Sequence, residues 1–436
     1  MNPAPLIDTA DLRVGMFIHL DLGWMSHPFA LSSFRIADAD QIATIRSLGL
    51  ARVRWSPEKS DSDAAAASAA PQDAATAPTP AAEAERTSAS RPMPLERDAR
   101  HEALAARQRA VELCQRQYVE AAQGWRQSVD RVRDDPLAAG QRIGALSRAL
   151  VDKMLSSREI SIRVLAETAG DRASHSLNVS VVALLLGKTC GLAATDLHDL
   201  GVGALSHDVG KLELPHRLHR ADPDFTRAEM ALYRDHVAHG IAHGKRMGLT
   251  PGALLVIAQH HEHCDASGFP QGLDVNRLSV AARLTALANR YDNLCHPAQV
   301  AHALTPHEAL SKLFTQGKGH FDPSFLTSFV RMMGVYPPGS VVQLTDDRFA
   351  IVDSVNSSRP LKPRVMVHDP KVSRETPLWL DLESEPTLGI RRSLPATQLP
   401  HAAQDVLRPP VRMAWFFEAS GDDGGQTDPD DAETRH

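Results

Sequence analysis

Two apolar segments of this chain end in adjacent ionisable residues, and this limits how the middle of the chain can fold. The segment "LGVGALSHD" ends in His207-Asp208, and "TPGALLVIAQHH" ends in His260-His261. Both segments have the apolar content of a packed helix, so each pair should be buried where a helix ends. A buried charge needs a partner. Since neighbouring helical residues point roughly 100° apart, each pair suits a cluster of metal ions in which each side chain reaches a different ion or one side chain bridges both.

Further candidate ligands lie before and between these pairs. His175 begins "HSLNVSVVALLLG", and Asp171 precedes it by one helical turn. His236 lies in "YRDHVAHGIAHG", where His239 and His243 are alternatives. Mixed imidazole and carboxylate ligands favour iron or manganese and suit zinc less clearly, because the four cysteines show no paired spacing. The residues alone therefore predict a buried site for two or three metal ions in a helical domain, and they leave the substrate open.

Composition divides the chain into parts. Strand-type residues with one short helix open it, an Ala/Pro/Ser/Thr-rich stretch follows, and short alternating apolar runs come after the helical region. The expected fold is mainly α, a helical bundle with a small N-terminal α/β module and a small C-terminal β unit. The predicted parts are 1–57 (small N-terminal module), 58–94 (disordered linker), 95–150 (helical connector, on the surface or at a dimer contact), 151–333 (helical domain), 334–395 (small β unit) and 418–436 (disordered acidic tail).

Helix starts are well marked in the predicted helical domain. Thr226 and Thr305 are each followed three residues later by a glutamate, which is the pattern of a capping box. Thr250 and Asp322 each stand directly before a proline, the pairing expected of a cap residue and the first helical position. These four positions therefore predict helix N-termini.

The net charge of −6 arises in the predicted tail. Residues 418–436 hold seven acids and one Arg435, and the remainder holds 46 basic and 46 acidic residues. This balance argues against a nucleic-acid partner bound through bulk charge. The start "MNPAPLIDTADLRVG" lacks a signal-peptide pattern, and the longest apolar run, "VSVVALLLG", is too short to cross a bilayer. With scattered, unpaired cysteines, these features predict a cytoplasmic protein without membrane insertion.

Several motifs occur in a fixed order in the predicted helical domain. They are "HS" at 175–176, "HDVGK" at 207–211, His236 with Gly240, "HHE" at 260–262, "DASGFP" at 265–270 and "ALANRYDNL" at 286–294. Together they resemble the HD-GYP family, a branch of the HD-domain metal-dependent phosphohydrolases, over roughly residues 155–333. The earlier segment "LRVGMFIHLDLGWMSHPF" with "FRI" resembles a small domain of unknown function that often precedes HD-GYP domains in proteobacteria.

The resemblance implies a function and its residues. The family hydrolyses cyclic di-GMP, a bacterial second messenger, to linear pGpG or on to GMP, with two or three iron or manganese ions. Asp208 would be the bridging carboxylate and Lys211 would contact a substrate phosphate, so both count as catalytic. Glu262 would accept N–H groups rather than bind metal. The substrate loop would be Gly268, Phe269 and Pro270, with Phe269 stacked on guanine. The implied metal ligands are His175, His207, Asp208, His236, His260, His261, Asn289 and Asp171.

The chain departs from the family pattern at several positions. Asn289 stands where a last aspartate ligand is expected, and a neutral amide binds metal more weakly. Phe269 replaces tyrosine and loses a hydroxyl group. Ala266 replaces glycine, which would strain a turn that requires a positive φ. The segment "CHPAQVAHA" after the last motif lacks the family's basic residues, so phosphate binding would depend more on Lys211 and the metals.

These departures leave alternatives to the phosphodiesterase. The first is a catalytically weak or inactive domain of the same fold that binds cyclic di-GMP or a partner protein. The second is an HD phosphohydrolase that acts on another nucleotide. The implied partners are cyclic di-GMP, signalling proteins such as diguanylate cyclases, and a second copy of the chain in a homodimer.

Overall fold

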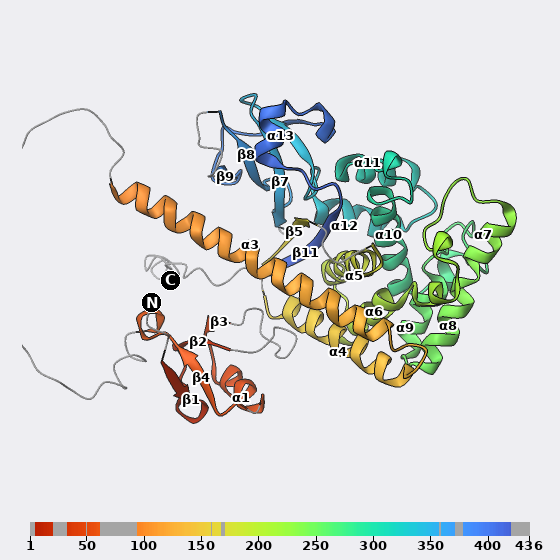
Figure 1. Cartoon of the computed structure of the whole chain (residues 1–436), viewed down its shortest axis with the longest axis horizontal. Helices are drawn as coiled ribbons and strands as arrows, with labels where there is room; N and C mark the ends of the chain where they lie inside the picture. Colours follow the sequence, from red (N-terminus) through yellow and green to blue (C-terminus); the bar gives the residue numbers. More distant parts are fainter. Residues whose placement is uncertain are drawn as a thin grey trace, which may run out of the picture. The chain divides into compact units, whose positions relative to one another are not determined.

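The computed structural model describes residues 5–20, 33–48, 50–61, 94–157, 159–166, 171–356, 359–370 and 378–419. The chain divides into two compact units, residues 1–112 and 113–436 (Figure 1). Most of the predicted linker 58–94 and nearly all of the predicted tail 418–436 lie outside the described residues. Within the described ranges, no helix has both the length and the apolar character that a membrane crossing requires.

The first unit contains the small α/β module expected at the N-terminus. Its antiparallel sheet has the strand order β1-β4-β2-β3. Ile18, Ile45 and Trp55 belong to one buried cluster, so helix and strands share a single core. The elements are β1 (Leu6–Asp8), β2 (Phe17–His19), β3 (Ser33–Arg35), α1 (Ala39–Ser47) and β4 (Arg52–Trp55).

The second unit joins a helical bundle to a sheet (Figure 1). Helix α6 lies at the centre of the bundle and packs against α4, α5 and α9. Two short 3-10 segments, η4 (Val209–Glu213) and η5 (His216–Leu218), follow α6. The helices are α3 (Pro94–Val129, which begins in the first unit), α4 (Pro136–Leu155), α5 (Asp171–Thr189), α6 (Ala194–Ser206), α7 (Arg227–Arg234), α8 (His236–Arg246), α9 (Pro251–Gln259), α10 (Val280–Cys295), α11 (Pro306–Gln316), α12 (Pro323–Met333) and α13 (His401–Leu407).

Helix α6 brings two of the predicted ligand pairs together. Its Leu197 and Leu200 are fully buried, and each such side chain contributes about 1.5–3 kcal/mol by leaving water. Gly203 faces α9, and a Cβ there would lie 2.5 Å from the Cβ of Val256. Only glycine permits this approach. Because α6 and α9 pack so closely, the residues that follow their C-terminal ends lie close together.

The predicted helix starts are confirmed. Thr226 and Thr305 form complete capping boxes with Glu229 and Glu308, respectively. Thr250 caps α9 through a bond from the backbone N–H of Ala253, and Asp322 caps α12. Side-chain oxygens therefore satisfy N–H groups that helix starts leave without partners.

The C-terminal half of α3 is part of the core, which differs from the surface or dimer helix expected there. Tyr118 and Trp125 are buried. The Tyr118 hydroxyl lies 2.8 Å from Ser174 Oγ on α5, and Trp125 Nε1 donates to the carbonyl of Leu205 on α6. Large apolar side chains are few in this Arg- and Ala-rich helix, but Tyr118 and Trp125 bind its C-terminal half to the bundle.

The seven-stranded sheet extends beyond the predicted unit 334–395. Its path is β10-β6-β7-β5-β11, and β8 pairs with β7 and β9. The sequence analysis placed residues 160–166 in the helical domain, but they form a buried strand whose partner β11 lies near the end of the described chain. The strands are β5 (Ile160–Ala166), β6 (Val341–Leu344), β7 (Phe349–Asn356), β8 (Arg364–His368), β9 (Leu378–Asp381), β10 (Ile390–Ser393) and β11 (Met413–Ala419).

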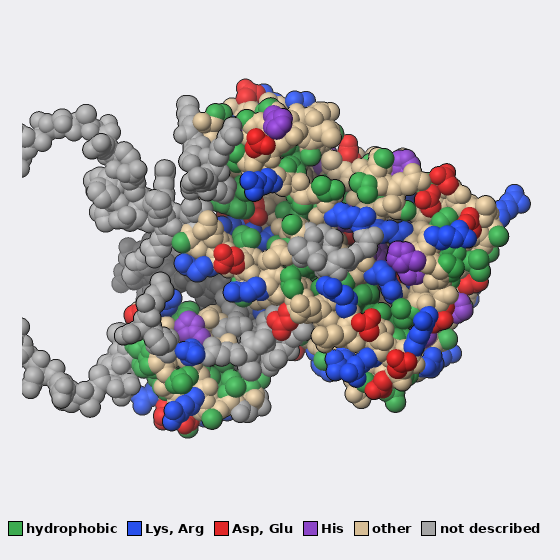
Figure 2. Space-filling view, in the orientation of Figure 1, with side chains coloured by type: hydrophobic (Ala, Val, Ile, Leu, Met, Phe, Trp, Pro, Cys, Tyr) green, Lys and Arg blue, Asp and Glu red, His purple; other side chains and the backbone are tan. Residues whose placement is uncertain are grey.

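A buried ion cluster joins three of these strands. Arg163 of β5 is fully buried, and its Nη1 donates to both carboxylate oxygens of Asp353 on β7 at 2.7 Å. Its Nε donates to Glu418 of β11 at 3.0 Å. Glu418 belongs to β11, so the predicted start of the disordered acidic tail at residue 418 is wrong. Elsewhere the described surface carries interspersed basic and acidic side chains on the face seen in Figure 2.

Replacing Arg163 with Met should lower the free energy of unfolding of the second unit by about 3–5 kcal/mol, because the buried Asp353 and the partly buried Glu418 both lose the cation that compensates them. Urea denaturation followed by tryptophan fluorescence measures the change. The control is Arg359→Met, since Arg359 pairs with Glu383 but is half exposed; it should cost less than about 1 kcal/mol. Equal losses in the two variants would contradict the role given to the buried cluster.

Candidate metal centre

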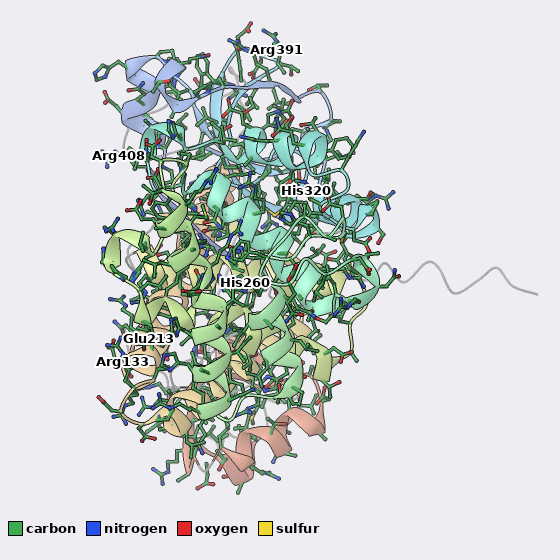
Figure 3. The ribbon with its side chains drawn as sticks, turned by 90° about the vertical axis from the view of Figure 1, so that its right-hand side faces the viewer. Arg133, Glu213, His260, His320, Arg391 and Arg408 are labelled. Atoms are coloured by element: carbon green, nitrogen blue, oxygen red, sulfur yellow. The ribbon has the colours of Figure 1, made fainter. Side chains whose placement is uncertain are left out.

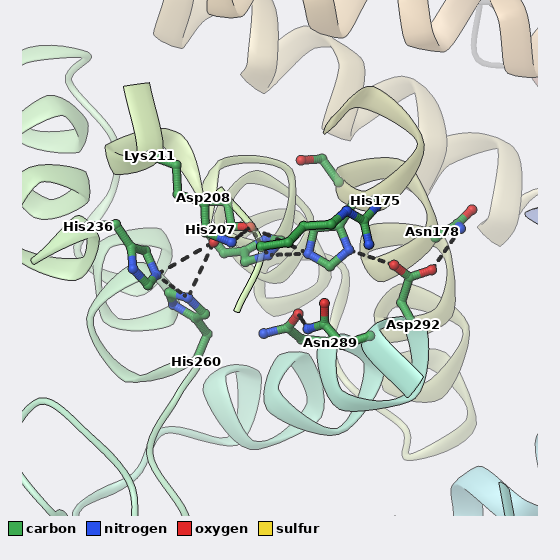
Figure 4. A network of polar contacts seen from close by, with 12 residues as sticks. His175, Asn178, His207, Asp208, Lys211, His236, His260, Asn289 and Asp292 are labelled. Atoms are coloured by element: carbon green, nitrogen blue, oxygen red, sulfur yellow. Dashed lines mark hydrogen bonds and ion pairs between the residues drawn. The ribbon is translucent and has the colours of Figure 1, made fainter. Parts of the chain in front are cut away.

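Six predicted ligands meet in the second unit, where several helices begin or end (Figure 4). His175 lies in the first turns of α5, and His207 and Asp208 directly follow α6. His236 begins α8, and His260 and His261 follow α9. One ligand atom from each of Asp208, His236, His260 and His261 lies within 4.8 Å of the others, and the same holds for His175, His207 and Asp208. Asp208 therefore belongs to two half-sites.

Three of the imidazoles are oriented by helix ends. Each directs its Nδ1 at the carbonyl three residues earlier, and a helix end leaves such carbonyls without an N–H partner. A carbonyl only accepts, so each Nδ1 carries the proton and each Nε2 keeps its lone pair. The pairs are His207 with Ala204 (2.7 Å), His236 with Tyr233, and His260 with Ile257 (2.8 Å).

The Nε2 atoms converge on Asp208. His175 Nε2 and His207 Nε2 are each 3.4 Å from its Oδ2, and His236 Nε2 and His260 Nε2 are 3.6 and 3.8 Å from its Oδ1. Oδ1 is buried and has no hydrogen-bond partner in the described part of the chain. One carboxylate oxygen thus faces each half-site.

These distances fit divalent metal ions. His207 Nε2 is 3.2 Å from His175 Nε2, and His236 Nε2 is 3.3 Å from His260 Nε2. Two nitrogen lone pairs this close repel each other unless a proton or a metal ion lies between them. Two nitrogens bound to one tetrahedral ion at about 2.1 Å are about 3.4 Å apart. The buried Oδ1 of Asp208, which has no hydrogen-bond partner among the described residues, also indicates a bound cation.

Burial disfavours a charged imidazole throughout the cluster, but at His175 the carboxylates of Asp208 and Asp292 outweigh burial and raise the pKa. Burial lowers the pKa of His236 to about 4 and holds those of His260 and His261 well below the ordinary value. Burial alone would raise the pKa of Asp208, but Lys211 and the neighbouring histidines hold it well below its usual range. The three imidazoles whose pKa is lowered are therefore neutral and Asp208 is ionised at neutral pH, the forms that bind metal.

Lys211 is buried and contacts the cluster directly. Its Nζ donates to Asp208 Oδ2 at 2.6 Å and lies 5.2 Å from the ring centre of Tyr233. Burial would lower the pKa of Lys211, but Asp208 outweighs it and holds the pKa above its ordinary value. Sequence reasoning missed Tyr233, which is buried and packs its ring against His236 and Phe269. The available signal was its position, one helical turn before His236.

The other two predicted ligands are placed differently. Asp171 begins α5, one turn before His175 as expected, but its side chain lies outside the described part of the structure. Asn289 is buried on α10, and its Oδ1 accepts a hydrogen bond from Asn293 Nδ2 at 2.7 Å. Metal binding by Asn289 would therefore use the second lone pair of an oxygen that already has a donor. Of the His236 alternatives, His243 pairs with Glu213 instead.

Asp292 is a site residue that sequence reasoning missed. It is buried on α10, and its Oδ2 accepts from His175 Nδ1 at 2.5 Å. Its Oδ1 accepts from Asn178 Nδ2 and lies 2.9 Å from His296 Nδ1. The bond between His175 Nδ1 and Asp292 turns Nε2 of the His175 ring toward Asp208. In this arrangement a carboxylate orients a metal-binding imidazole. Asp292 lies in the quoted "ALANRYDNL", one turn after Asn289, so the signal was present.

The substrate-loop candidates lie beside the cluster and are anchored by Glu262. As expected, its carboxylate accepts backbone N–H groups, from Gln271 at 2.7 Å and Leu273 at 2.9 Å. Gly268 lies against this anchor, and a Cβ there would be 2.4 Å from the Glu262 Cα. Ala266 has a φ of 63°. The missing glycine therefore costs roughly 1–2 kcal/mol of backbone strain.

Phe269 already has partners on its ring. It stacks on His261 with ring centres 4.4 Å apart, and the Arg234 guanidinium lies 5.0 Å from its centre. Phe269, Pro270 and Arg234 also line a hollow of about 830 Å³ with residues of α7 and α8. A nucleobase that stacks on Phe269 would have to compete with one of these groups, which the sequence did not indicate.

Comparison with known proteins identifies both parts of the chain. Residues 6–142 match a domain of unknown function, DUF3391, and residues 149–325 match an HD domain. A cyclic di-GMP phosphodiesterase of Pseudomonas aeruginosa is 26% identical over 373 residues, which cover 83% of this chain and 84% of that protein.

Two further relatives match shorter stretches of the chain. A cyclic di-GMP phosphodiesterase response regulator of Xanthomonas campestris is 25% identical over 208 residues, covering 47% of this chain and 55% of that protein. The 3'3'-cGAMP-specific phosphodiesterase 2 of Vibrio cholerae is 25% identical over 185 residues, covering 40% of this chain and 35% of that protein. This chain spans about half and about a third of their lengths, respectively.

Replacing Asp292 with Asn should weaken metal binding about 10–100-fold, because the amide still accepts from His175 but no longer raises the basicity of its ring. Titration of metal-free protein with Mn²⁺ measures the affinity. Asp346→Asn is the matched control, since Asp346 pairs with Arg348 in the sheet, and it should bind as the unmodified protein does. Unchanged affinity in Asp292→Asn would exclude Asp292 as a positioning residue.

Proposed function

We propose, on the premise that this chain carries an HD domain behind a DUF3391 domain, that it is a metal-dependent phosphodiesterase that hydrolyses cyclic di-GMP. The observation that carries the proposal is the convergence of imidazole Nε2 atoms on the two oxygens of one buried carboxylate, Asp208. Divalent ions bound there would lower the pKa of a water molecule and neutralise charge on phosphoryl oxygens.

The ligands divide between the two half-sites. His175 and His207 would hold one ion with Asp208 Oδ2, and His236, His260 and His261 would hold the other with Asp208 Oδ1. Asn289 and Asp171 are proposed as additional ligands, Asp171 for a third ion. Imidazole and carboxylate ligands without thiolates favour iron or manganese.

Lys211 would act on the substrate phosphate. In the structure its ammonium group pairs with Asp208 Oδ2. Once ions share that carboxylate, the lysine is available to a phosphoryl oxygen of the nucleotide. Hydrolysis joins a water oxygen to phosphorus and breaks the phosphorus bond to the ribose 3' oxygen, which leaves with a proton. The product is linear pGpG, and a second hydrolysis gives GMP.

A second function is favoured by two observations on the same site. The Asn289 oxygen is already bonded, and Lys211 is held by Asp208. Both would weaken turnover more than nucleotide binding. The alternative is therefore a module that binds cyclic di-GMP, or a signalling partner, without hydrolysis.

The protein loaded anaerobically with Fe²⁺ or Mn²⁺ should convert cyclic di-GMP to linear dinucleotide or GMP, as followed by chromatography with 3'3'-cGAMP run in parallel. Asp208→Asn should lower the rate at least about 10²-fold, because it weakens both half-sites. Metal content is counted in the same samples. Intact cyclic di-GMP with two ions bound would rule out the hydrolase, and nucleotide binding without product would favour the second function.

Replacing Asn289 with Asp should raise metal affinity about 10-fold or more, because the carboxylate keeps the acceptor for Asn293 and adds a negative charge near the cations. Isothermal titration with Mn²⁺ measures this, and Asn289→Ala provides the comparison. If Asn289 binds metal, the alanine variant loses affinity. Equal affinities in all three proteins would show that Asn289 is not a ligand.

A further inference from the structure

A second cluster of metal-binding side chains lies at the base of the substrate loop. It consists of His263 and Asp265, which follow α9, and His320 in the turn between α11 and α12. One ligand atom from each lies within 4.8 Å of the others. The cluster shares no residue with the first centre, and Figure 3 shows His320 well separated from His260. His320 and Asp265 are 44% and 38% exposed, so an ion could enter from solvent.

Hydrogen bonds prepare two of these side chains for a cation. His263 Nδ1 lies 2.9 Å from Ser267 Oγ, and the Ser267 hydroxyl donates to Asp265 Oδ1 at 2.6 Å. Because the hydroxyl has one proton, His263 Nδ1 must donate to it, and the Nε2 lone pair of His263 is left for a ligand bond. Asp265 Oδ2 takes no part in this chain of bonds and lies 3.6 Å from His320 Nε2.

The backbone holds the two segments in place without an ion. Cys264 N–H donates to the carbonyl of His320 at 2.8 Å, and Val275 N–H donates to the carbonyl of Cys264 at 3.1 Å. Asp265 also pairs with Asp274 in an isolated β-bridge. The three ligands are therefore presented by a prearranged scaffold, and ion binding would require only side-chain movement.

We propose that His263, Asp265 and His320 bind a divalent transition-metal ion of the zinc class, outside the catalytic centre. Zinc binds in proteins through two imidazoles and one carboxylate with water in the open position, and the same ligand types also bind iron and manganese. The His263 and His320 rings now stack in parallel at 4.6 Å. They would rotate about their Cβ–Cγ bonds so that both lone pairs meet one ion, which their partial exposure permits.

Such an ion would link the substrate loop to the α11–α12 turn. His263 and Asp265 lie a few residues before Gly268 and Phe269, and Glu262 anchors the same loop from inside. The site goes beyond the proposed function, and its binding does not depend on which nucleotide the domain accepts. A bound ion would hold the base of the substrate loop to the α11–α12 turn, in addition to the anchor that Glu262 provides.

Equilibrium dialysis of the full chain against Zn²⁺, with metal counted per chain, tests the proposal. His320→Gln and Asp265→Asn should each bind one zinc ion fewer than the unmodified protein. His302→Gln, which changes an exposed histidine elsewhere, should show no loss. His207→Ala should lose ions of the first centre but keep the ion that depends on His320. The double variant, His207→Ala with His320→Gln, should therefore bind one zinc ion fewer than His207→Ala alone.

The outcomes separate the two sites. Equal zinc content in the unmodified protein and His320→Gln would overturn the proposal, as would a loss in His320→Gln that Asp265→Asn does not share. Circular dichroism of the metal-free variants checks that the fold is kept. Failure of the phosphodiesterase assay would leave the zinc count unchanged, so the two proposals can fail independently.

Discussion

The burial of one ionised carboxylate, Asp208, organises the helical domain. An isolated charge in the protein interior is costly, and its neighbours must compensate it. Lys211 does so directly, and imidazoles at the ends of four helices surround both oxygens. Three of these imidazoles direct Nδ1 at a carbonyl that a helix end leaves free, and the fourth, His175, donates to Asp292 instead. The positions at which α6, α7 and α9 end thus follow from the same requirement as the site.

This requirement explains which parts of the site were predictable. The ligands themselves are local features of the sequence, since polar pairs that end apolar helices are conspicuous there. The residues that orient them are not. Asp292 reaches His175 across a helix pair, and Tyr233 looks like an ordinary core aromatic until the fold places it between Lys211 and Phe269. The role of a side chain that acts through a neighbour can be predicted only when the position of that neighbour is known.

The same limit applies to the fold. Helices α4 to α12 depend on local periodicity and caps, and the sequence predicted their region well. The strand β5 depends on β11, which follows it by more than two hundred residues, so no local pattern could join them. The charge of Glu418 shows this most directly. In the sequence it belongs to an acidic terminal run, whereas in the structure it compensates the buried Arg163.

The substrate loop combines rigidity with groups whose partners can be replaced. Glu262 and the glycine packing at 268 fix its course, and Ala266 holds a strained conformation within it. The groups that would meet a nucleotide are engaged internally, Phe269 by His261 and Arg234 and Lys211 by Asp208 and Tyr233. A phosphodiester anion at Lys211 would compete with Asp208, and metal ions bound to Asp208 would weaken that competitor by sharing its charge. Metal binding would therefore come before substrate binding, and the balance between hydrolysis and simple binding would depend on how completely ions occupy the Asp208 half-sites.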